Sequence, residues 1–470
     1  QVSFGQSGPR GLFQLHASST GNRAELARTL TNRLRERQID PRTLLDVVDV
    51  PTADPLRLTL AAALERGLTY NLGIISLEEQ VESAKGSRIR SLRALMPRVD
   101  ARVNDSRQTT NLAAFGFNAD ALGIPGISFP SVVGPFNVFD ARVYASQPLF
   151  DRAASNDIRS STFAVNAAQL DARNARDTVT LVVTSLYFQA MAGQSRIETA
   201  KAQVATAEQL FNLATTQRNA GVTPGIDVVR AQVQVQAQKQ RLIAAENDFA
   251  KLKLQLARAI GLPVEQALDL ADANASLAAP ALSVDDAVKR AMENRADYRA
   301  LTERVHAAEA TLKAVQAEAL PTVQVNADYG TIGSAPSNAA RTYSFSGTVR
   351  LSVFDTGRKG RELEDTARLK QRQAEAADYA QRIAAEVRSA YLDVQASEQQ
   401  LAVANERVKL AQQELSLAQT RFTAGVTSNL EVIQAQGGLS TATDTQIAAA
   451  YAFNVAKATL ARAVGGQSAR

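Results

Sequence analysis

The chain has 470 residues, of which 45% are hydrophobic and 21% are charged, a composition typical of folded rather than disordered proteins. It carries 52 Lys and Arg against 47 Asp and Glu. Since no dense basic stripe accompanies the net charge of +5, we expect no nucleic-acid partner. The absence of cysteine excludes disulfides, thiolate metal sites and a cysteine nucleophile.

The chain opens with an N-terminal extension, which we place at residues 1–55. Within it, "NRAELARTLTNRLRERQ" at 22–38 predicts a short charged helix. The opening residues "QVSFGQSGPRG" lack the charged-then-apolar order of a secretion signal, so either the protein is cytoplasmic or a signal peptide has already been removed. No run of 18 apolar residues occurs, and the sequence therefore predicts no transmembrane helix.

Beyond this extension the sequence repeats itself. "AGVT" at 220–223 returns 204 residues later at 424–427, and "LARAIG" at 256–261 returns at the same offset as "LARAVG" at 460–465. A fixed offset over so long a stretch indicates one structural unit written twice. We predict a first repeat at 56–261, a linker at 262–283, a second repeat at 284–465 and a C-terminal tail at 466–470.

Each repeat is predicted to open with a helix, followed by two strands. In the second repeat Val323, Val325 and Ala327 alternate with polar residues, and this period of two predicts strands with one apolar and one polar face. The predicted strands lie at 97–105 and 137–150, separated by a loop at 106–136, and at 321–330 and 341–354. The opening helix of the second repeat is predicted at 284–319.

Each pair of strands leads into a long helix and then a shorter return helix. The long helices are predicted at 152–220 and 356–424, and at a rise of 1.5 Å per residue each is about 100 Å long. Helices of that length exceed an ordinary globular domain and must line up as a bundle or a tube. The return helices are predicted at 225–261 and 428–464.

The "AGVT" turns join the long helices to the return helices. Gly221 and Gly425 stand where a helix ends in the left-handed conformation, with Val222 and Val426 as the apolar contact that follows. Pro224 suits the first position of the return helix. Because the valines would be exposed at each far tip, the pattern predicts a docking end there.

Four amphipathic strands per chain would form a sheet with two open edges. Such a sheet can span a bilayer only within a closed barrel, so the pattern predicts a barrel assembled from several copies of the chain. The polar alternate face would line water, and the apolar face would contact lipid.

The ordered duplication of strand, loop, strand and long helix, with "AGV" tips followed by "DV" or "EV" and with "LARAIG" and "LARAVG" ends, resembles the outer membrane efflux proteins of TolC type over about residues 56–466. The resemblance implies a mixed α and β membrane protein that assembles as a homotrimer. Four β-strands per chain would make a 12-stranded β-barrel, and a long α-helical barrel would continue it into the periplasm, with 262–283 in an equatorial region. It also implies the outer membrane of a Gram-negative-type bacterium, with the signal peptide already removed.

The implied function is a passive exit duct of a tripartite efflux or type I secretion system, opened at its periplasmic tip. The implied partners are a periplasmic adaptor (membrane fusion) protein, an inner-membrane pump of RND or ABC type and outer membrane lipid. The alternative is a long-helix structural or coiled-coil protein without channel activity, which would explain the helices but not the four alternating strands. We expect no enzyme, no catalytic residues, no metal and no cofactors, since no Ser/His/Asp set, phosphate-binding Gly loop or metal cluster occurs in the sequence.

Two acidic residues, Asp227 and Glu431, hold equivalent positions just after the tips. The resemblance implies that they project into the narrowed tunnel end, where a ring of carboxylates would make a cation-selective constriction. The other interpretation is structural: "SNLE" at 428–431 matches a capping box, and an acidic first turn suits the helix dipole.

Three further positions of the candidate constriction depart from the family pattern. Gln434 and Arg230 stand where a second acidic residue would follow, and Phe422 stands where the family often has a gate tyrosine. We therefore expect a closed state that depends more on packing than on a phenol hydrogen bond. The candidate adaptor-docking residues are Ala220, Gly221, Val222 and Thr223 at the first tip and Ala424, Gly425, Val426 and Thr427 at the second.

Overall fold

The computed structural model describes residues 2–6, 13–17, 54–115, 131–271, 277 and 283–466. The predicted charged helix at 22–38 and residues 116–130 of the predicted loop lie outside this part of the chain. In the N-terminal extension, β1 (Val2–Gln6) and β2 (Phe13–Ala17) pair antiparallel.

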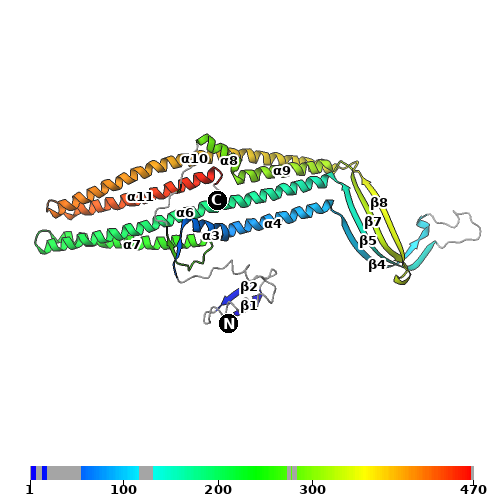
Figure 1. Cartoon of the computed structure of the whole chain (residues 1–470), viewed down its shortest axis with the longest axis horizontal. Coiled ribbons are helices and arrows are strands. Elements are labelled where there is room, and N and C mark those ends of the chain that lie inside the picture. The colour runs from blue at the N-terminus through cyan, green and yellow to red at the C-terminus, as the bar shows by residue number, and fades with distance from the viewer. Residues whose placement is uncertain are drawn as a thin grey trace, which may run out of the picture.

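Two long helices run along the long axis of the molecule (Figure 1). They are α6 (Arg152–Asn219) and α10 (Thr356–Thr423), and each contains 68 residues, which makes each about 100 Å long. Their N-terminal ends reach the sheet at one end of the molecule, and their C-terminal ends reach the opposite end (Figure 1).

The repeated Phe-Asp pair marks the start of both long helices. The carboxylate of Asp151 accepts a hydrogen bond from the backbone N–H of Ala154 (2.9 Å), and that of Asp355 accepts one from the N–H of Gly357 (2.8 Å). A carboxylate at this position satisfies a backbone donor that the first turn leaves free, so the aspartates stabilise the change from extended chain to helix.

Shorter helices pack along the two long ones. Toward the far tips, α7 (Gly225–Ala259) packs against α6, α11 (Asn429–Ala463) packs against α10, and α11 also contacts α6. Toward the sheet, α4 (Leu72–Leu92) packs on α6, and α9 (Ala296–Ala317) packs on both α6 and α10. Two more helices, α3 (Leu60–Tyr70) and α8 (Val284–Asn294), lie near the middle, and single 3-10 turns occupy Arg93–Leu95, Leu112–Phe115 and Pro336–Asn338.

The prediction of one continuous helix at 284–319 is wrong, because the chain breaks at Arg295 into α8 and α9. Arg295 has the extended backbone angles φ −62° and ψ 121°, and its side chain is only 4% exposed. The guanidinium bonds the carboxylates of Asp297 (2.7 Å) and Glu386 (2.7 Å), the second of which lies on α10. These two ion pairs of Arg295 therefore hold the break between α8 and α9 against α10.

Near the middle of the molecule, a core joins the segment that precedes the first repeat's helices to the segment that follows its return helix. β3 (Leu56–Leu58) and β6 (Leu268–Leu270) pair in parallel beside α6 and α7. The fully buried Tyr187 of α6 donates a hydrogen bond from its hydroxyl to the Leu58 carbonyl (3.1 Å), and Ile260 lies in the same apolar cluster. The short strands are therefore anchored to the long helix at this level.

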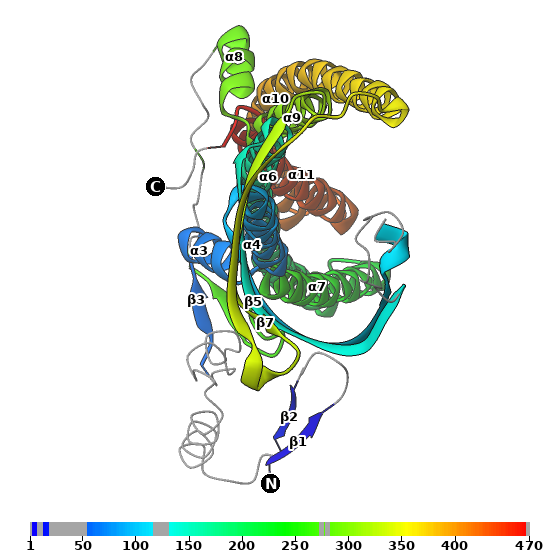
Figure 2. The same cartoon turned by 90° about the vertical axis from the view of Figure 1, so that its right-hand side faces the viewer.

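A four-stranded antiparallel sheet forms the end of the molecule opposite the tips, with the strand order β4-β5-β7-β8. Its strands are β4 (Arg98–Asn111), β5 (Val132–Phe150), β7 (Thr322–Gly333) and β8 (Ala340–Arg350). Thus β4 and β5 extend into the loop predicted at 106–136, since Asn111 still pairs with Val132. Seen along the long axis from this end, the sheet is strongly curved (Figure 2).

The two faces of the sheet differ in chemistry. On one face Arg142 of β5 bonds Asp140 on its own strand and Asp328 on β7 (3.1 Å). Gly330 lies opposite Arg142, and a Cβ there would lie 2.1 Å from the Ala141 carbonyl oxygen, so glycine is required where these strands approach.

The other face is apolar and exposed in the single chain. Tyr343 and Phe345 of β8 are 79% and 75% exposed, and Val103 of β4 is 74% exposed. None of the helices among the described residues is long and apolar enough to cross a membrane.

Candidate functional site at the helical tips

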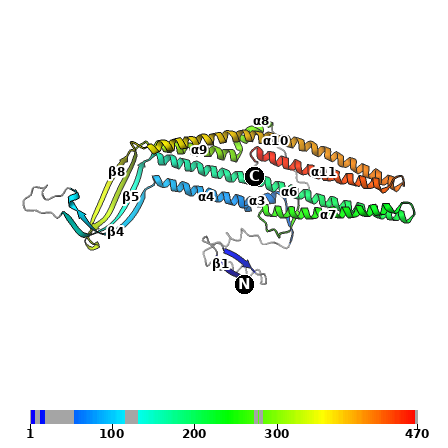
Figure 3. The ribbon, with the colours of Figure 1, turned by 180° about the vertical axis from the view of Figure 1, so that it is seen from behind.

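The two turns that join long and return helices lie together at one end of the molecule, opposite the sheet (Figure 3). Both have the same hydrogen bonds: the Val222 N–H donates to the Gln217 carbonyl (2.9 Å), and the Val426 N–H donates to the Arg421 carbonyl (3.0 Å). In each turn an N–H bonds the carbonyl five residues earlier. This bond is typical of a helix C-terminus at which the residue before the donor has left-handed backbone angles. The left-handed residues are Gly221, with φ of 76°, and Gly425, with φ of 71°.

Both tips expose an apolar side chain. Val222 is 66% exposed and Val426 is 69% exposed, and a Cβ added at Gly221 or Gly425 would meet nothing within 4 Å. The glycines are therefore needed for their backbone angles and not for space. Of the other candidate docking residues, Ala220 and Ala424 are exposed, and Thr223 and Thr427 are half-buried.

The position predicted for Pro224 is wrong by one residue. Pro224 is the N-cap of α7, with an extended ψ of 152°, and the helix begins at Gly225. Proline still suits this position, because the first backbone N–H groups of a helix have no partner within the helix. The N–H of Asp227 nevertheless donates to the Pro224 carbonyl (3.1 Å) and closes the first turn.

Asp227 lies inside the tip, and only 5% of its side chain is exposed. The nearest cation is Arg230, one turn further along α7, whose Nη1 lies 3.4 Å from Asp227 Oδ1. The Arg230 side chain is 45% exposed, so this ion pair joins a buried carboxylate to a half-exposed cation.

Glu431 is more accessible, with 37% of its side chain exposed. The Arg421 guanidinium of α10 lies 3.2 Å from one carboxylate oxygen, and the Thr427 hydroxyl donates to the other (2.6 Å). The predicted capping box at 428–431 does not form, since the Ser428 side chain makes no capping hydrogen bond. Thr427 takes the place of Ser428 as the partner of Glu431.

The remaining two candidates differ in burial. Phe422 is 2% exposed and packs in the tip core with Ala214 of α6 and Val432 of α11. Gln434 is exposed on α11. Phe422 thus belongs to the packing of this chain, and Gln434 is available to a neighbouring molecule or to solvent.

The sequence did not indicate one central residue of the tip, Asn429. This side chain is fully buried, and its Nδ2 donates to the backbone carbonyl of Asp227 (2.6 Å). The bond joins the start of α11 to the first turn of α7, and so it links the two tips. One sequence signal could have found it. The equivalent position of the first repeat holds Gly225, which has no side chain, so the two repeats differ at this point of otherwise similar turns.

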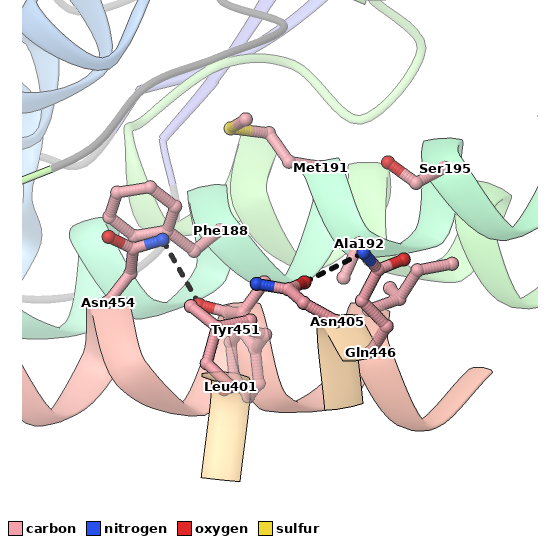
Figure 4. Close-up of a pocket in the computed structure, with 11 residues that line it drawn as sticks. Phe188, Met191, Ala192, Ser195, Leu401, Asn405, Gln446, Tyr451 and Asn454 are labelled. Carbon is pink, nitrogen blue, oxygen red and sulfur yellow. Dashed lines mark hydrogen bonds between the residues drawn. The ribbon is translucent and has the colours of Figure 1, made fainter. Parts of the chain in front are cut away.

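A hollow of about 230 Å³ lies far from the tips, where α6, α10 and α11 meet (Figure 4). Phe188 and Met191 give it apolar walls, and Gln446 donates a hydrogen bond to Asn405 (2.8 Å) at its edge. Tyr451 is the one titratable side chain that lines it. The hollow therefore offers no acid–base pair for catalysis.

Comparison with known proteins gives a family match over most of the chain. The family model described as "Outer membrane efflux protein" matches residues 76–262 and 287–466. A pyoverdine export outer membrane protein, OpmQ of Pseudomonas putida, is 24% identical over 333 residues, which cover 70% of each chain. The toluene efflux pump outer membrane protein TtgC of Pseudomonas putida is 26% identical over 297 residues, which cover 60% of each chain and thus less than two thirds of that relative.

A solved structure shares the fold. The outer membrane protein VceC of Vibrio cholerae superposes with a TM-score of 0.74 over 87% of this chain and 96% of that chain. The two sequences are 17% identical, so the likeness concerns the arrangement of helices and strands alone.

Proposed function

Since this chain belongs to the outer membrane efflux protein family, we propose that it forms the passive exit duct of a tripartite efflux or type I secretion system. The family consists of outer membrane efflux channels of Gram-negative bacteria and not of enzymes, and this chain has their TolC-like fold of helices and strands. The observation that carries the proposal is the sheet: two edge strands, one exposed apolar face and one charged face.

A closed assembly of three chains would satisfy both sheet edges. Within the described part of the chain, β4 and β8 each pair with one strand only, which leaves one edge of each free. When β8 of one chain pairs with β4 of the next, a head-to-tail ring closes, and three copies of four strands make the 12-stranded barrel. The apolar face with Tyr343 and Phe345 would then contact lipid, and the face with Arg142 would line the water-filled lumen.

The helical part offers a matching seam. Toward the tips the helices lie in the row α7, α6, α11, α10, so α7 and α10 are the outer members. Both expose apolar side chains along their length. These are Ile226, Val229, Val233, Ile243 and Leu254 on α7, and Leu392, Val403, Leu410 and Leu417 on α10. Packing of α7 against α10 of the next chain would bury both stripes and continue the barrel as a helical tube.

The internal duplication accounts for this arrangement. Each predicted repeat, 56–261 and 284–465, contributes two strands, a long helix and a return helix to the ring. The linker at 262–283 would then join the two repeats at the equatorial level.

The tips are the proposed docking and opening end. Val222 and Val426 are apolar, exposed and mounted on equivalent turns, which suits contact with a periplasmic adaptor protein that connects to an inner-membrane pump of RND or ABC type. Opening would realign the helix pairs about Gly221 and Gly425. The ion pair between Arg421 and Glu431 is partly exposed to solvent, so it would contribute only about 0–1 kcal/mol to the closed state.

Glu431 is the stronger candidate for the constriction. Its carboxylate is more exposed than that of Asp227, and Gln434 lies one turn further along the same helix. Asp227 would affect the electrostatic potential in the pore indirectly, by partly neutralising the more exposed charge of Arg230. Phe422 would support the constriction by packing in the tip core. The relatives named for pyoverdine and toluene carry different cargo, which fits a duct whose walls do not select it.

A planar bilayer recording tests the proposed duct. The purified protein, reconstituted at neutral pH, is expected to give discrete cation-preferring conductance from a trimeric species. Glu431→Ala should reduce the cation preference more than Asp227→Ala. A protein that never conducts and stays dispersed without detergent would favour the alternative, a structural helical protein.

A further inference from the structure

A layer of polar side chains crosses the helical wall between the tips and the middle of the molecule. Gln203 and Thr206 of α6, Gln238 of α7 and Gln436 of α11 line one hollow of about 30 Å³. Leu415 and Leu439 complete its lining. We call this set, together with Ser440, the polar layer.

The polar layer contains buried amide atoms that are not hydrogen-bonded. Gln238 is 3% exposed and Gln436 is 9% exposed. Within the part of the chain that the structure describes, Gln238 Oε1 and both amide atoms of Gln436 have no hydrogen-bond partner. Buried amides without partners are costly, and native proteins rarely retain them unless an ordered water or another ligand completes the bonds.

The hollow has the size and the lining of a water site. About 30 Å³ exceeds the roughly 10–15 Å³ that one water molecule requires, and the unsatisfied amide atoms supply both donors and acceptors. A cation fits less well, because the Arg241 guanidinium already lies in this layer and donates to the Ser440 hydroxyl (3.1 Å). Ser440 in turn donates to Gln203 Oε1 (3.2 Å), so the network is extended by hydrogen bonds rather than by charge.

We propose that the polar layer binds an ordered water molecule between Gln238 and Gln436 and that this hydrated layer divides the wall into two mechanical units. Apolar clusters lie on both sides of it: Leu210, Phe422 and Val432 pack toward the tip, and Val408 and Ala442 pack toward the middle. Hydrogen bonds mediated by water can exchange partners at little cost in free energy when the helices shift. Closely packed apolar side chains instead transmit such a shift to their neighbours. The tip segments beyond the layer therefore move together when the end opens, a role that rests on the proposed duct.

The water itself can be tested without any channel activity. A high-resolution structure of the full trimer from crystals soaked in rubidium chloride is expected to show density within hydrogen-bond distance of Gln238 Oε1 and the Gln436 amide, without anomalous signal. An anomalous peak would identify a monovalent cation site and overturn the proposal. An empty hollow, or amides bonded directly to each other, would overturn it as well.

The mechanical role is tested by hydrogen–deuterium exchange on the full trimer in detergent. Residues 207–237 and 416–435 are expected to exchange faster than the helix segments on the other side of the polar layer. The double variant Gln238→Leu with Gln436→Leu should slow that exchange several-fold, because an apolar layer joins the two clusters. Gln209→Leu, an exposed glutamine on α6, is the matched control and should change nothing.

The single variant Gln238→Met serves if the double variant does not assemble, and the same slowing is expected to a smaller degree. Unchanged or faster exchange in an assembled variant would overturn the mechanical role. A wild-type protein that binds the water but fails to conduct would instead count against the proposed duct. The two failures are thus distinguishable.

Discussion

At the scale of single residues, the tips depend on a contact that joins residues far apart in the chain. Asn429 and Asp227 are 202 positions apart, yet the Asn429 amide reaches the Asp227 carbonyl. Asn429→Ala would remove this buried bond between the starts of α11 and α7, so we expect a loss of about 1 kcal/mol in the free energy of unfolding. A lowered midpoint of thermal unfolding, together with a larger open fraction in bilayer recordings, would show that the bond holds the tips together.

The exposed Gln434 on the same helix provides the control for this variant. Gln434→Ala removes an amide that no buried group needs, and the thermal midpoint should stay unchanged. Equal midpoints for Asn429→Ala and Gln434→Ala would contradict the assigned role of Asn429.

The ion cluster at the break between α8 and α9 gives a pH dependence. Burial opposes ionisation of Asp297, but hydrogen bonds from Arg295, the charge of Arg295 and the Tyr379 hydroxyl outweigh it and lower the pKa of Asp297 below its ordinary value of 3.8. A carboxyl whose pKa is lower in the folded state stabilises the fold above its ordinary pKa. That contribution is lost as the pH falls through the lowered value.

Asp297→Asn should therefore destabilise the protein at pH 7 and weaken its acid sensitivity. Removing one partner leaves the Arg295 charge buried with Glu386 alone, which we expect to cost about 3 kcal/mol. Thermal unfolding followed from pH 7 to below pH 4 should show a lower midpoint at neutral pH and a shallower fall in acid. Glu386→Gln, at a carboxylate that is 36% exposed, should have a smaller effect. The same acid slope in wild type and Asp297→Asn would speak against the cluster.

Much of the tip could be predicted from its sequence, because its backbone is determined locally. Gly221 and Gly425 adopt the left-handed angles that the repeated turn indicates, and Val222 and Val426 are exposed beyond them. The burial of Asp227 could not be predicted in this way. It depends on how α7 lies against α11, and that placement follows from tertiary packing and not from the spacing of residues along either helix.

At the scale of elements, both opening helices are broken by residues that are neither Gly nor Pro. Asn71, between α3 and α4, has an extended ψ of 121° like Arg295 between α8 and α9. In each case the side chain has a partner elsewhere in the fold: the Asn71 amide donates to the Ala259 carbonyl (3.1 Å), and Arg295 bonds Glu386. A pattern of helix-forming residues cannot reveal such a break, because the cause is a tertiary contact.

Asn71 also caps the helix that follows it, since its side-chain oxygen accepts a hydrogen bond from the Gly73 N–H (2.9 Å). Asn71→Ala should cost about 1–2 kcal/mol, because it removes the cap and the bond to Ala259 together. Asn71→Asp keeps the cap and loses the donor, so its loss should be smaller. Denaturant unfolding of the two variants separates the effects, and an equal loss in both would attribute the whole effect to the bond with Ala259.

At the scale of the whole molecule, the alternating pattern predicted strands, and the order of elements predicted an elongated protein. The strand predicted at 321–330 corresponds to β7 at Thr322–Gly333. The pattern did not predict that β7 pairs with β5 of the first half, nor that Arg142 would bond Asp328 across that pair. Strand order in a sheet is a long-range property, and each strand's own alternation is compatible with several neighbours.

The assembly of three chains can be tested at the proposed seam between α7 and α10, because the chain contains no cysteine of its own. Val233 and Leu417 are exposed, and each lies about two turns from its tip, so they would face each other across neighbouring chains. A double variant, Val233→Cys with Leu417→Cys, treated with a short thiol crosslinker, should run as a covalent trimer on a denaturing gel. Pairing Val233→Cys with Leu392→Cys provides the control, since Leu392 lies about 40 Å further along α10 and should give no product. A ring in which α7 met another surface would leave the first pair unlinked, and the helical tube would then need a different seam.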